Sequence, residues 1–519
     1  MRYQESAERM DLKLLRNQSN QAVLALIFIF LAVRLVLAAT LGFTVDESYT
    51  VAIAHGLSLS YFDHPPLHYW IVHAFLPILG DGHAARLPFV FLFSASSWLL
   101  FMLTRQLFSA EAGVWAVLSL NLSIFFTLSP GGWIVPDGPL LFCLLAAALT
   151  IAQSQFPNDT VPSPWKTWLL TGFWVGLAGL SKYHAFLFAL GLLVFFATSR
   201  ERRHTLFHPA PWVGALLALI IVSPVLIWNV QNNWVSFTYQ LGRAAPSGAV
   251  RVGNFFANIG GQFLYLLPWI FVPLIMAAFK ALRAGRARKH SWYCLCLAMP
   301  TIVIFTVVPL WGDRGLPHWQ MPGWLLLFPI LGDCLASETN KPRLRRWAIT
   351  STSLMAGLLF LMAGHTVTGY GRILFPSLFA RGDPTLEAFE WTPLRNELKT
   401  RGFFDRKDMF IVAPDWLNAG RIGQALEGNL PVIAFGASND PKHFAFRYNP
   451  NAFVGHDALV IGRKINSEIL SRLQPYFDSI EELPPVSFGR SGMNEIELRL
   501  LLARRLKMPF PSPYGMRPH

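Results

Sequence analysis

Acidic and imidazole side chains gather in one stretch of an otherwise charge-poor chain, residues 43–70, with the sequence FTVDESYTVAIAHGLSLSYFDHPPLHYW. The stretch contains Asp46, Glu47, Asp63, His64 and His68. Carboxylates and imidazoles are the groups that most often accept, donate or orient protons in catalysis. Because only 14% of the 519 residues are charged, this concentration predicts a site where chemistry takes place.

The elements that must position these groups are membrane helices. The chain is 53% hydrophobic with a mean hydropathy of +0.39. Mostly apolar runs of about 17 to 25 residues can cross a bilayer as helices, which satisfy their own backbone hydrogen bonds. We predict an α-helical polytopic membrane protein with about eleven transmembrane helices, near residues 22–41, 85–103, 112–128, 138–153, 167–180, 185–198, 211–229, 255–278, 291–310, 321–336 and 347–364.

The distribution of basic residues predicts the orientation, because short cytoplasmic loops retain Lys and Arg. With the N-terminus inside, most basic residues fall in inner segments. The net charge of +13 is therefore a topology signal and an attraction to anionic membrane lipids, and we expect no nucleic-acid partner. The outer loops hold far fewer cations, chiefly Lys182, Arg243, Arg251 and Arg314.

A separate soluble domain is predicted after the last apolar run, because the later runs shorten to strand length. Two segments with helical spacing lie between the predicted strands, which indicates a small C-terminal α/β domain. We predict two domains, 1–364 in the membrane and 365–519 outside it. The predicted strands are DMFIVAP (408–414), LPVIAFG (430–436), DALVIG (457–462) and EIELRLLL (495–502).

The first outer loop, residues 42–84, is too long and too aromatic for a plain linker. Its sequence predicts two short amphipathic helices lying along the membrane surface. The double proline of YFDHPP interrupts them, since proline cannot continue a helix, and the resulting turn presents Asp63 and His64.

An acidic pair directly after the first span, followed by the motif YFDHPPL, resembles the protein O-mannosyltransferase and aminoarabinose (lipid A) transferase group of the GT-C glycosyltransferase superfamily. The resemblance covers roughly residues 20–200 in its motifs and extends to the plan of many spans plus an outer C-terminal domain. It implies that the membrane domain is of the GT-C catalytic type. It also implies a polyprenyl-phosphate-linked sugar as donor, with inversion of the anomeric centre during transfer.

By this resemblance, Asp46 is the catalytic carboxylate that takes or orients the proton of the acceptor. Glu47, the next residue, is a candidate for substrate binding or for holding the local helix structure. Asp137, in the sequence PDG, matches the second acidic position. Asp63 and His64 match the acidic and basic residues before the double proline. Aminoarabinose transferases tend to have lysine at the position of His64. An imidazole is mostly neutral near pH 7, so the role of His64 as a cation is in question.

The leaving phosphate requires cations or backbone donors, which work best when they are preorganised in a partly dry site. Lys182 is the first choice because it is a lone cation between two apolar runs, and Arg243 is the second because its planar fork can grip phosphate. Further candidates for substrate binding are His184 and His318, with Tyr49 and Tyr61 as aromatic surfaces for the sugar or the polyprenyl chain.

Each assignment has a structural alternative. The acidic pair also suits a helix N-terminus, where it complements the dipole. Asp137 also suits a turn, and Lys182 and His184 also suit the membrane interface. A divalent metal ion is left open: carboxylates and imidazoles are common ligands, but no D-x-D spacing is present.

The sequence thus predicts an inverting glycosyltransferase that acts at the outer face of a bacterial inner membrane. The expected acceptor is a glycolipid such as lipid A or lipopolysaccharide core, and a protein acceptor is the alternative. A lipid or solute transporter would place ionisable residues within the spans and often shows paired halves. In this sequence the candidate acids gather at one face, and no paired halves are seen. A receptor whose outer domain binds a partner is the third class considered.

Overall fold

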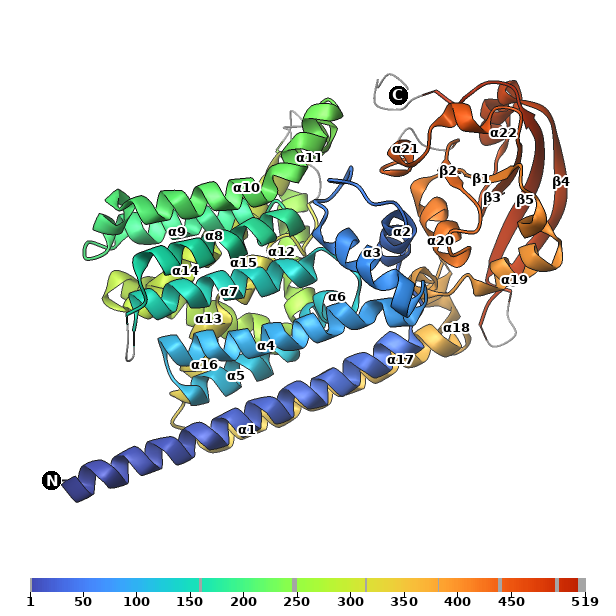
Figure 1. Ribbon diagram of the computed structural model, residues 1–519. Helices are drawn as coiled ribbons and strands as arrows, with labels where there is room; N and C mark the ends of the chain where they lie inside the picture. Colours follow the sequence, from blue (N-terminus) through green and yellow to red (C-terminus); the bar gives the residue numbers. More distant parts are fainter. Residues whose placement is uncertain are drawn as a thin grey trace.

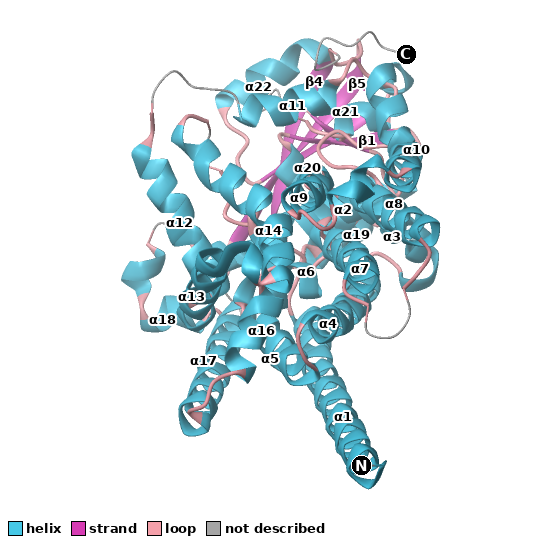
Figure 2. Cartoon of the chain, turned by 90° about the vertical axis from the view of Figure 1, so that its left-hand side faces the viewer, coloured by secondary structure: helices cyan, strands magenta, loops and turns pink. Residues whose placement is uncertain are grey.

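The structure is a computed structural model that describes residues 2–157, 161–244, 250–312, 315–380, 382–436, 441–490 and 494–511. A bundle of helices forms the N-terminal part, and an α/β domain packs on one end of this bundle (Figure 1). The first helix, α1 (Arg2–Thr40), begins at the opposite end of the bundle from the α/β domain. Figure 2 shows the same arrangement after a turn of 90°.

The other helices of the bundle follow one another through short connections, some of which are single turns of 3-10 helix. Their bounds are η1 (His83–Arg86), α4 (Leu87–Leu107), α5 (Ala110–Asn121), α6 (Ile124–Gly132), α7 (Asp137–Gln155), α8 (Pro164–Ser181), α9 (Ala185–Thr198), η2 (Arg203–Phe207), α10 (Pro209–Gln231), α11 (Val235–Ala244), α12 (Val252–Leu266), α13 (Pro268–Ala284), η3 (Gly285–Ala287), α14 (Lys289–Val307), η4 (Val308–Leu310), α15 (Met321–Leu325), α16 (Phe328–Ala336) and α17 (Lys341–Thr368).

Within the described residues, 7 helices are long and apolar enough to cross a membrane, or up to 8 if the bent pair α5 and α6 forms one span. Helices or helix pairs cover all the predicted runs, so a polytopic helical protein is confirmed while the count of eleven spans stays a prediction. The run 255–278 is two helices, α12 and α13. They break where Leu267 takes a φ of 69° before Pro268, whose ring suits the first position of a new helix.

The predicted α/β domain is confirmed, and its described residues form one 5-stranded sheet of order β2-β1-β3-β5-β4. β1 pairs in parallel with β2 and β3, whereas β5 pairs antiparallel with β3 and β4. The strand β4 was not predicted, because its residues are mostly exposed and a bulge between Leu483 and Val486 accommodates its double proline. The strands are β1 (Met409–Ala413), β2 (Val432–Ala434), β3 (Asp457–Gly462), β4 (Phe477–Phe488) and β5 (Ile496–Leu506).

Helices and single turns connect the last span to this sheet and cover it. Their bounds are α18 (Tyr370–Leu374), η5 (Pro376–Phe379), η6 (Pro384–Ala388), α19 (Thr392–Thr400), η7 (Phe403–Asp405), α20 (Trp416–Ala425), α21 (Phe444–Arg447), η8 (Pro450–Phe453), α22 (Ser467–Leu473) and η9 (Gln474–Tyr476).

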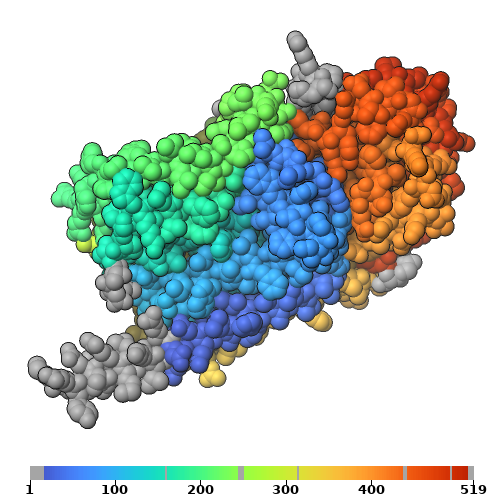
Figure 3. All heavy atoms as spheres, in the orientation of Figure 1, coloured from blue at the N-terminus to red at the C-terminus, as the bar shows by residue number. Residues whose placement is uncertain are grey.

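The first outer loop forms the predicted helices α2 (Val45–Ala54) and α3 (Leu67–Leu79), but other parts of the protein cover most of α2. Its residues from Glu47 to Ala54 are buried, and it packs against α20 of the C-terminal domain. Figure 3 shows the C-terminal domain in direct contact with this part of the chain. The reason for the difference is that a second domain, rather than lipid, covers the apolar side of α2.

The packing of α2 on α20 depends on glycine. A Cβ atom added at Gly420 would lie 2.9 Å from the Cα atom of Tyr49, and one added at Gly423 would lie 2.9 Å from the Cβ atom of Ala52. Both distances are shorter than real Cβ contacts, so the two helices touch through the bare glycine backbone.

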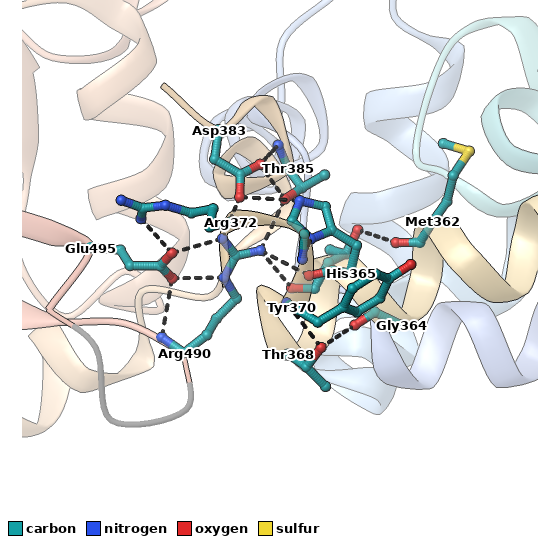
Figure 4. A network of polar contacts seen from close by, with 12 residues as sticks. Met362, Gly364, His365, Thr368, Tyr370, Arg372, Asp383, Thr385, Arg490 and Glu495 are labelled. Carbon is teal, nitrogen blue, oxygen red and sulfur yellow. Dashed lines mark hydrogen bonds and ion pairs between the residues drawn. The ribbon is translucent and has the colours of Figure 1, made fainter. Parts of the chain in front are cut away.

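A buried network of ion pairs holds the end of α17 to the C-terminal domain (Figure 4). Arg490 donates from Nη2 to Asp383 Oδ2 at 2.6 Å and from Nε to Glu495 Oε2 at 2.7 Å. Its Nη1 donates to the carbonyl oxygen of His365, in the last turn of α17, at 3.1 Å. The network therefore fixes the C-terminal domain to the bundle at a second place, apart from α2.

We expect the variant Gly420→Ala to lower the free energy of unfolding by about 1–3 kcal/mol, because the added methyl group meets the backbone of α2. Thermal unfolding of the purified protein in detergent measures the effect. Gly357→Ala is the matched control, since a Cβ atom on this glycine of α17 meets nothing within 4 Å. Equal stability of the two variants would contradict the close packing of α2 on α20.

Candidate active site

A capping box starts α2 and separates its two acidic residues. The hydroxyl of Thr44 accepts a hydrogen bond from the amide of Glu47 at 3.4 Å, and the Glu47 carboxylate accepts one from the amide of Thr44 at 3.0 Å. Successive residues of a helix point about 100° apart. Because the box turns Glu47 inward, Asp46 points to a different side.

Glu47 forms a fully buried ion pair with Arg86. The guanidinium donates from Nε to Glu47 Oε1 at 2.7 Å and from Nη2 to Oε2 at 2.8 Å. Arg86 also donates to the carbonyl oxygens of Ala38, Leu41 and Gly42 at the end of α1. The structure thus places Glu47, predicted to bind substrate, outside the cavity described next, where it holds α2 in position.

A cavity of about 700 Å³ lies between the bundle and the C-terminal domain. Its polar wall comes from α2, the turn before α3, the start of α7, the end of α8, α11 and the segment before α15. Trp416 and Lys442 of the C-terminal domain complete this wall. The charged and imidazole groups that line it are Asp46, Asp63, His64, His68, Asp137, Lys182, Arg243, His318 and Lys442.

Asp46 is exposed inside this cavity, and among the described residues its carboxylate makes no hydrogen bond or ion pair. Burial by the surrounding protein raises its pKa, and the carboxylates of Asp63, Glu47 and Glu387 add to this effect. Lys442 acts in the opposite direction. A carboxylate that is unpaired and has a raised pKa is suited to accept a proton.

Asp63 is buried at the centre of a hydrogen-bonded cluster. Its Oδ1 atom accepts from the hydroxyls of Tyr49 at 3.0 Å and Tyr69 at 3.2 Å, and its Oδ2 atom lies 3.4 Å from the Nζ atom of Lys442. Burial alone would raise the pKa of Asp63, but Lys442, His64 and the Tyr49 hydrogen bond together lower it to about 2. Asp63 is thus a permanent anion that orders the groups around it.

The histidines of the cavity are neutral at pH 7. Burial, with a contribution from Lys182 and Lys442, lowers the pKa of His64 to about 4. Burial and Lys182 lower the pKa of His318 to about 3. His68 is fully buried, and its two ring nitrogens have no hydrogen-bond partner in the described part of the chain. These rings can hydrogen-bond a substrate but do not supply positive charge.

The two predicted phosphate ligands differ in their surroundings. Lys182 donates to both carboxylate oxygens of Asp137, each at 3.0 Å, so its charge is already balanced in a buried pair. Arg243 lies over the rings of Trp319 at 4.8 Å and Tyr239 at 5.8 Å. No ion pair of Arg243 occurs among the described residues. Its guanidinium is therefore the cation of the cavity that is available to an incoming anion.

Two other predicted binding residues do not line the cavity. Tyr61 is buried, donates to the carbonyl oxygen of Gly56 at 3.0 Å and stacks on Tyr69 at 4.0 Å. His184 stacks on Phe305 at 4.6 Å. The predicted candidate Arg314 lies outside the described residues.

The C-terminal domain supplies two cavity residues that were not predicted, Trp416 and Lys442. The ammonium of Lys442 lies 3.2 Å from the centre of the Trp416 ring and 5.1 Å from that of Tyr49. No local sequence signal marks these two residues, because the cavity residues that they contact, Tyr49 and Asp63, precede them by several hundred residues. Over the residues that the structure describes, no group of three or more His, Cys, Asp or Glu side chains could hold a metal ion.

Residues 63–228 match the family described as dolichyl-phosphate-mannose-protein mannosyltransferase. The chain is 26% identical over 283 residues to a lipid A galacturonosyltransferase of Rhizobium johnstonii, covering 51% of this chain and 55% of that protein. It is 23% identical over 332 residues to an undecaprenyl phosphate-alpha-4-amino-4-deoxy-L-arabinose arabinosyl transferase of Edwardsiella ictaluri, covering 61% of this chain and 59% of that protein. The chain thus spans somewhat more than half the length of these curated relatives.

The fold is that of ArnT from Cupriavidus metallidurans, whose crystal structure in the apo state superposes with a TM-score of 0.65. The sequence identity is 15%, and the match covers 93% of this chain and 98% of that one. At this level of identity, the likeness concerns the fold.

The fold and the cavity define a class of membrane protein in which a charged site lies between a helix bundle and a small α/β domain. With the family match and the relatives, they confirm the resemblance seen in the sequence. The chain is thus similar, in residues 63–228 and in fold, to the GT-C group that contains the protein O-mannosyltransferases and the aminoarabinose transferases.

We expect Arg86→Gln to destabilise the protein by about 3–5 kcal/mol, because it leaves the Glu47 carboxylate buried without a counter-charge. The midpoint of thermal unfolding in detergent measures this loss. Arg401→Gln, which breaks a more exposed pair with Glu397, is the control and is expected to cost less than about 1 kcal/mol. A stable Arg86→Gln variant would show that the pair does not hold α2.

Proposed function

We propose that this chain transfers a sugar from a polyprenyl phosphate to an acceptor hydroxyl or phosphate, with inversion at the anomeric carbon. The observation that carries this proposal is the combination of an unpaired carboxylate, Asp46, and an unpaired guanidinium, Arg243, in the walls of one cavity. Asp46 can accept the proton of the attacking acceptor, and Arg243 can bind the phosphate that leaves the donor. The named relatives and the family match support a reaction of this class.

In the proposed reaction, the acceptor oxygen attacks the anomeric carbon of the donor from the face opposite the phosphate. The new bond joins that carbon to the acceptor oxygen while the bond from the carbon to the phosphate oxygen breaks. A hydroxyl acceptor passes its proton to the carboxylate of Asp46. Arg243 balances the charge that develops on the departing phosphate, and its planar fork can contact two phosphate oxygens. A single displacement of this kind gives inversion.

The apolar walls support lipid-linked substrates. On one side, the cavity is lined by Ile124, Leu264, Leu358 and Met362 from α6, α12 and α17. A second cavity of about 470 Å³, with an almost entirely apolar lining, lies among α8, α9 and α10. Two residues of its lining, Tyr183 and Phe237, are close in sequence to the charged cavity's Lys182 and Tyr239. We assign these apolar surfaces to hydrocarbon chains of the donor and the acceptor.

For the substrates, we propose an undecaprenyl-phosphate type of donor and a glycolipid acceptor such as lipid A or lipopolysaccharide core. Another structure of ArnT from Cupriavidus metallidurans is bound to undecaprenyl phosphate and superposes with a TM-score of 0.64. The relatives include a lipopolysaccharide core galacturonosyltransferase of Rhizobium johnstonii. We place the protein in a bacterial inner membrane, with the N-terminus in the cytoplasm and the C-terminal domain in the periplasm.

We expect Asp46→Asn to lower the rate of transfer by at least about 100-fold, because the amide cannot accept the proton. Purified protein, an undecaprenyl-phosphate-linked sugar and vesicles containing lipid A form the assay, and mass spectrometry of the lipids gives the rate and the product. Asp408→Asn, at an exposed carboxylate of the C-terminal domain, is the control.

Full activity of Asp46→Asn would remove the assignment of the catalytic carboxylate. Movement of the donor across the vesicle membrane without a product would favour a transporter. Sugar found on a co-purified protein instead of on lipid A would favour a protein acceptor. Adding EDTA to the same assay tests the divalent metal ion that the sequence left open.

We expect Arg243→Gln to weaken binding of undecaprenyl phosphate about 10- to 100-fold, because a hydrogen-bonded ion contact with the phosphate is lost. Titration of the purified protein with undecaprenyl phosphate measures the dissociation constant. Arg251→Gln is the matched control. Arg251 belongs to the same predicted outer loop and lies directly before α12, but it does not line the cavity. If both variants bind equally well, Arg243 is not the phosphate ligand.

A further inference from the structure

Lys442 brings a positive charge from the C-terminal domain into the cavity. Its side chain is 9% exposed, and its Nζ atom lies 3.4 Å from Asp63 Oδ2. The ring of Trp416, from the same domain, lies directly against the ammonium. Lys442, Asp63 and Asp46 line the same cavity.

The backbone around Lys442 is held independently of its ammonium. The amide of His443 donates to the hydroxyl of Tyr49 at 3.1 Å, and the Nδ1 atom of His443 accepts from the amide of Phe62 at 3.2 Å. Arg447 donates to the carbonyl oxygen of Ala52 on α2. Because these contacts also dock the segment, the charge of Lys442 is not needed for docking alone, and it acts on the acids of the cavity: Asp63 at 3.4 Å and Asp46 in the same wall.

The other cations of the cavity region are already committed or differently placed. Arg86 is paired with Glu47, and Lys182 is paired with Asp137. Arg243 stacks on the aromatic rings of α11 and the segment before α15.

Three carboxylates, those of Asp63, Glu47 and Glu387, act on Asp46 and favour its protonated form. Lys442 is the cation that opposes them, and it also faces His64 and the ring of Tyr49.

We propose that Lys442 is a positioning residue through which the C-terminal domain keeps Asp46 ionised, so that Asp46 can accept a proton at neutral pH. This proposal rests on the proposed function, because it assigns the role of base to Asp46. The active site is then shared between the two domains, and the docked C-terminal domain is a requirement for catalysis.

The test compares the full-length wild type with Lys442→Met and Lys442→Arg in lipid nanodiscs. Dicyclohexylcarbodiimide reacts with protonated carboxyl groups, so its attachment to Asp46, followed by peptide mass spectrometry across pH, reports the ionisation of that side chain without turnover. Methionine keeps the packing on Trp416 but removes the charge. We expect the midpoint of labelling to move upward by about one pH unit in Lys442→Met, and arginine to restore it.

The direction of the expected shift in the labelling midpoint follows from the positive charge that Lys442→Met removes. Without the ammonium, the protonated form of Asp46 is favoured, its pKa rises further, and the acidic limb of the transfer rate moves to higher pH by the same amount. Arg447→Gln is the control for docking alone: we expect a lower unfolding temperature and an unchanged labelling midpoint.

An unchanged midpoint in Lys442→Met would overturn the proposal. So would an equal shift in Arg447→Gln, because docking would then explain the effect. Weaker binding of undecaprenyl phosphate by Lys442→Met, without a shift, would make Lys442 a substrate ligand and also overturn it. Absence of sugar transfer by the wild type would contradict the proposed function. The labelling midpoints would still measure the effect of Lys442 on Asp46.

Discussion

The buried pair of Glu47 and Arg86 is the interaction on which the site depends. Removing two charges from water is costly, and the cost is offset here because every nitrogen of the guanidinium donates to a carboxylate or carbonyl oxygen. The pair fixes the end of the first span against the start of α2. The next carboxylate, that of Asp46, is then presented to the cavity by the geometry of a helix.

The charges of the cavity follow a simple pattern. Asp137 is matched by Lys182 and Asp63 by Lys442, each within a few ångströms. Asp46 and Arg243 are left without such partners among the described residues. A site in which one anion and one cation are unpaired is prepared for a reaction that delivers a proton to one and a phosphate to the other. The proposed transfer is a reaction of that kind.

Much of this arrangement could be predicted from residue types and spacing. The span pattern located the bundle, and the acids after the first span together with YFDHPP indicated Asp46 and Asp63. The resemblance singled out Asp46 as the catalytic carboxylate, but the residues alone could not show that Glu47 pairs with Arg86, because that depends on which side of one helix turn meets Arg86. The sequence also could not find Lys442 or the break at Leu267, because the first depends on contacts distant in the chain and the second on a single backbone angle.

The position of α2 between the two domains has a consequence for biosynthesis. A ribosome completes the acidic stretch early, but the lysine that faces it is made several hundred residues later. A partly made chain therefore carries the carboxylates of its first outer loop without the cation that balances them. On this account, activity begins only when the last domain has folded onto the bundle, so an unfinished chain in the membrane does not consume lipid-linked sugar.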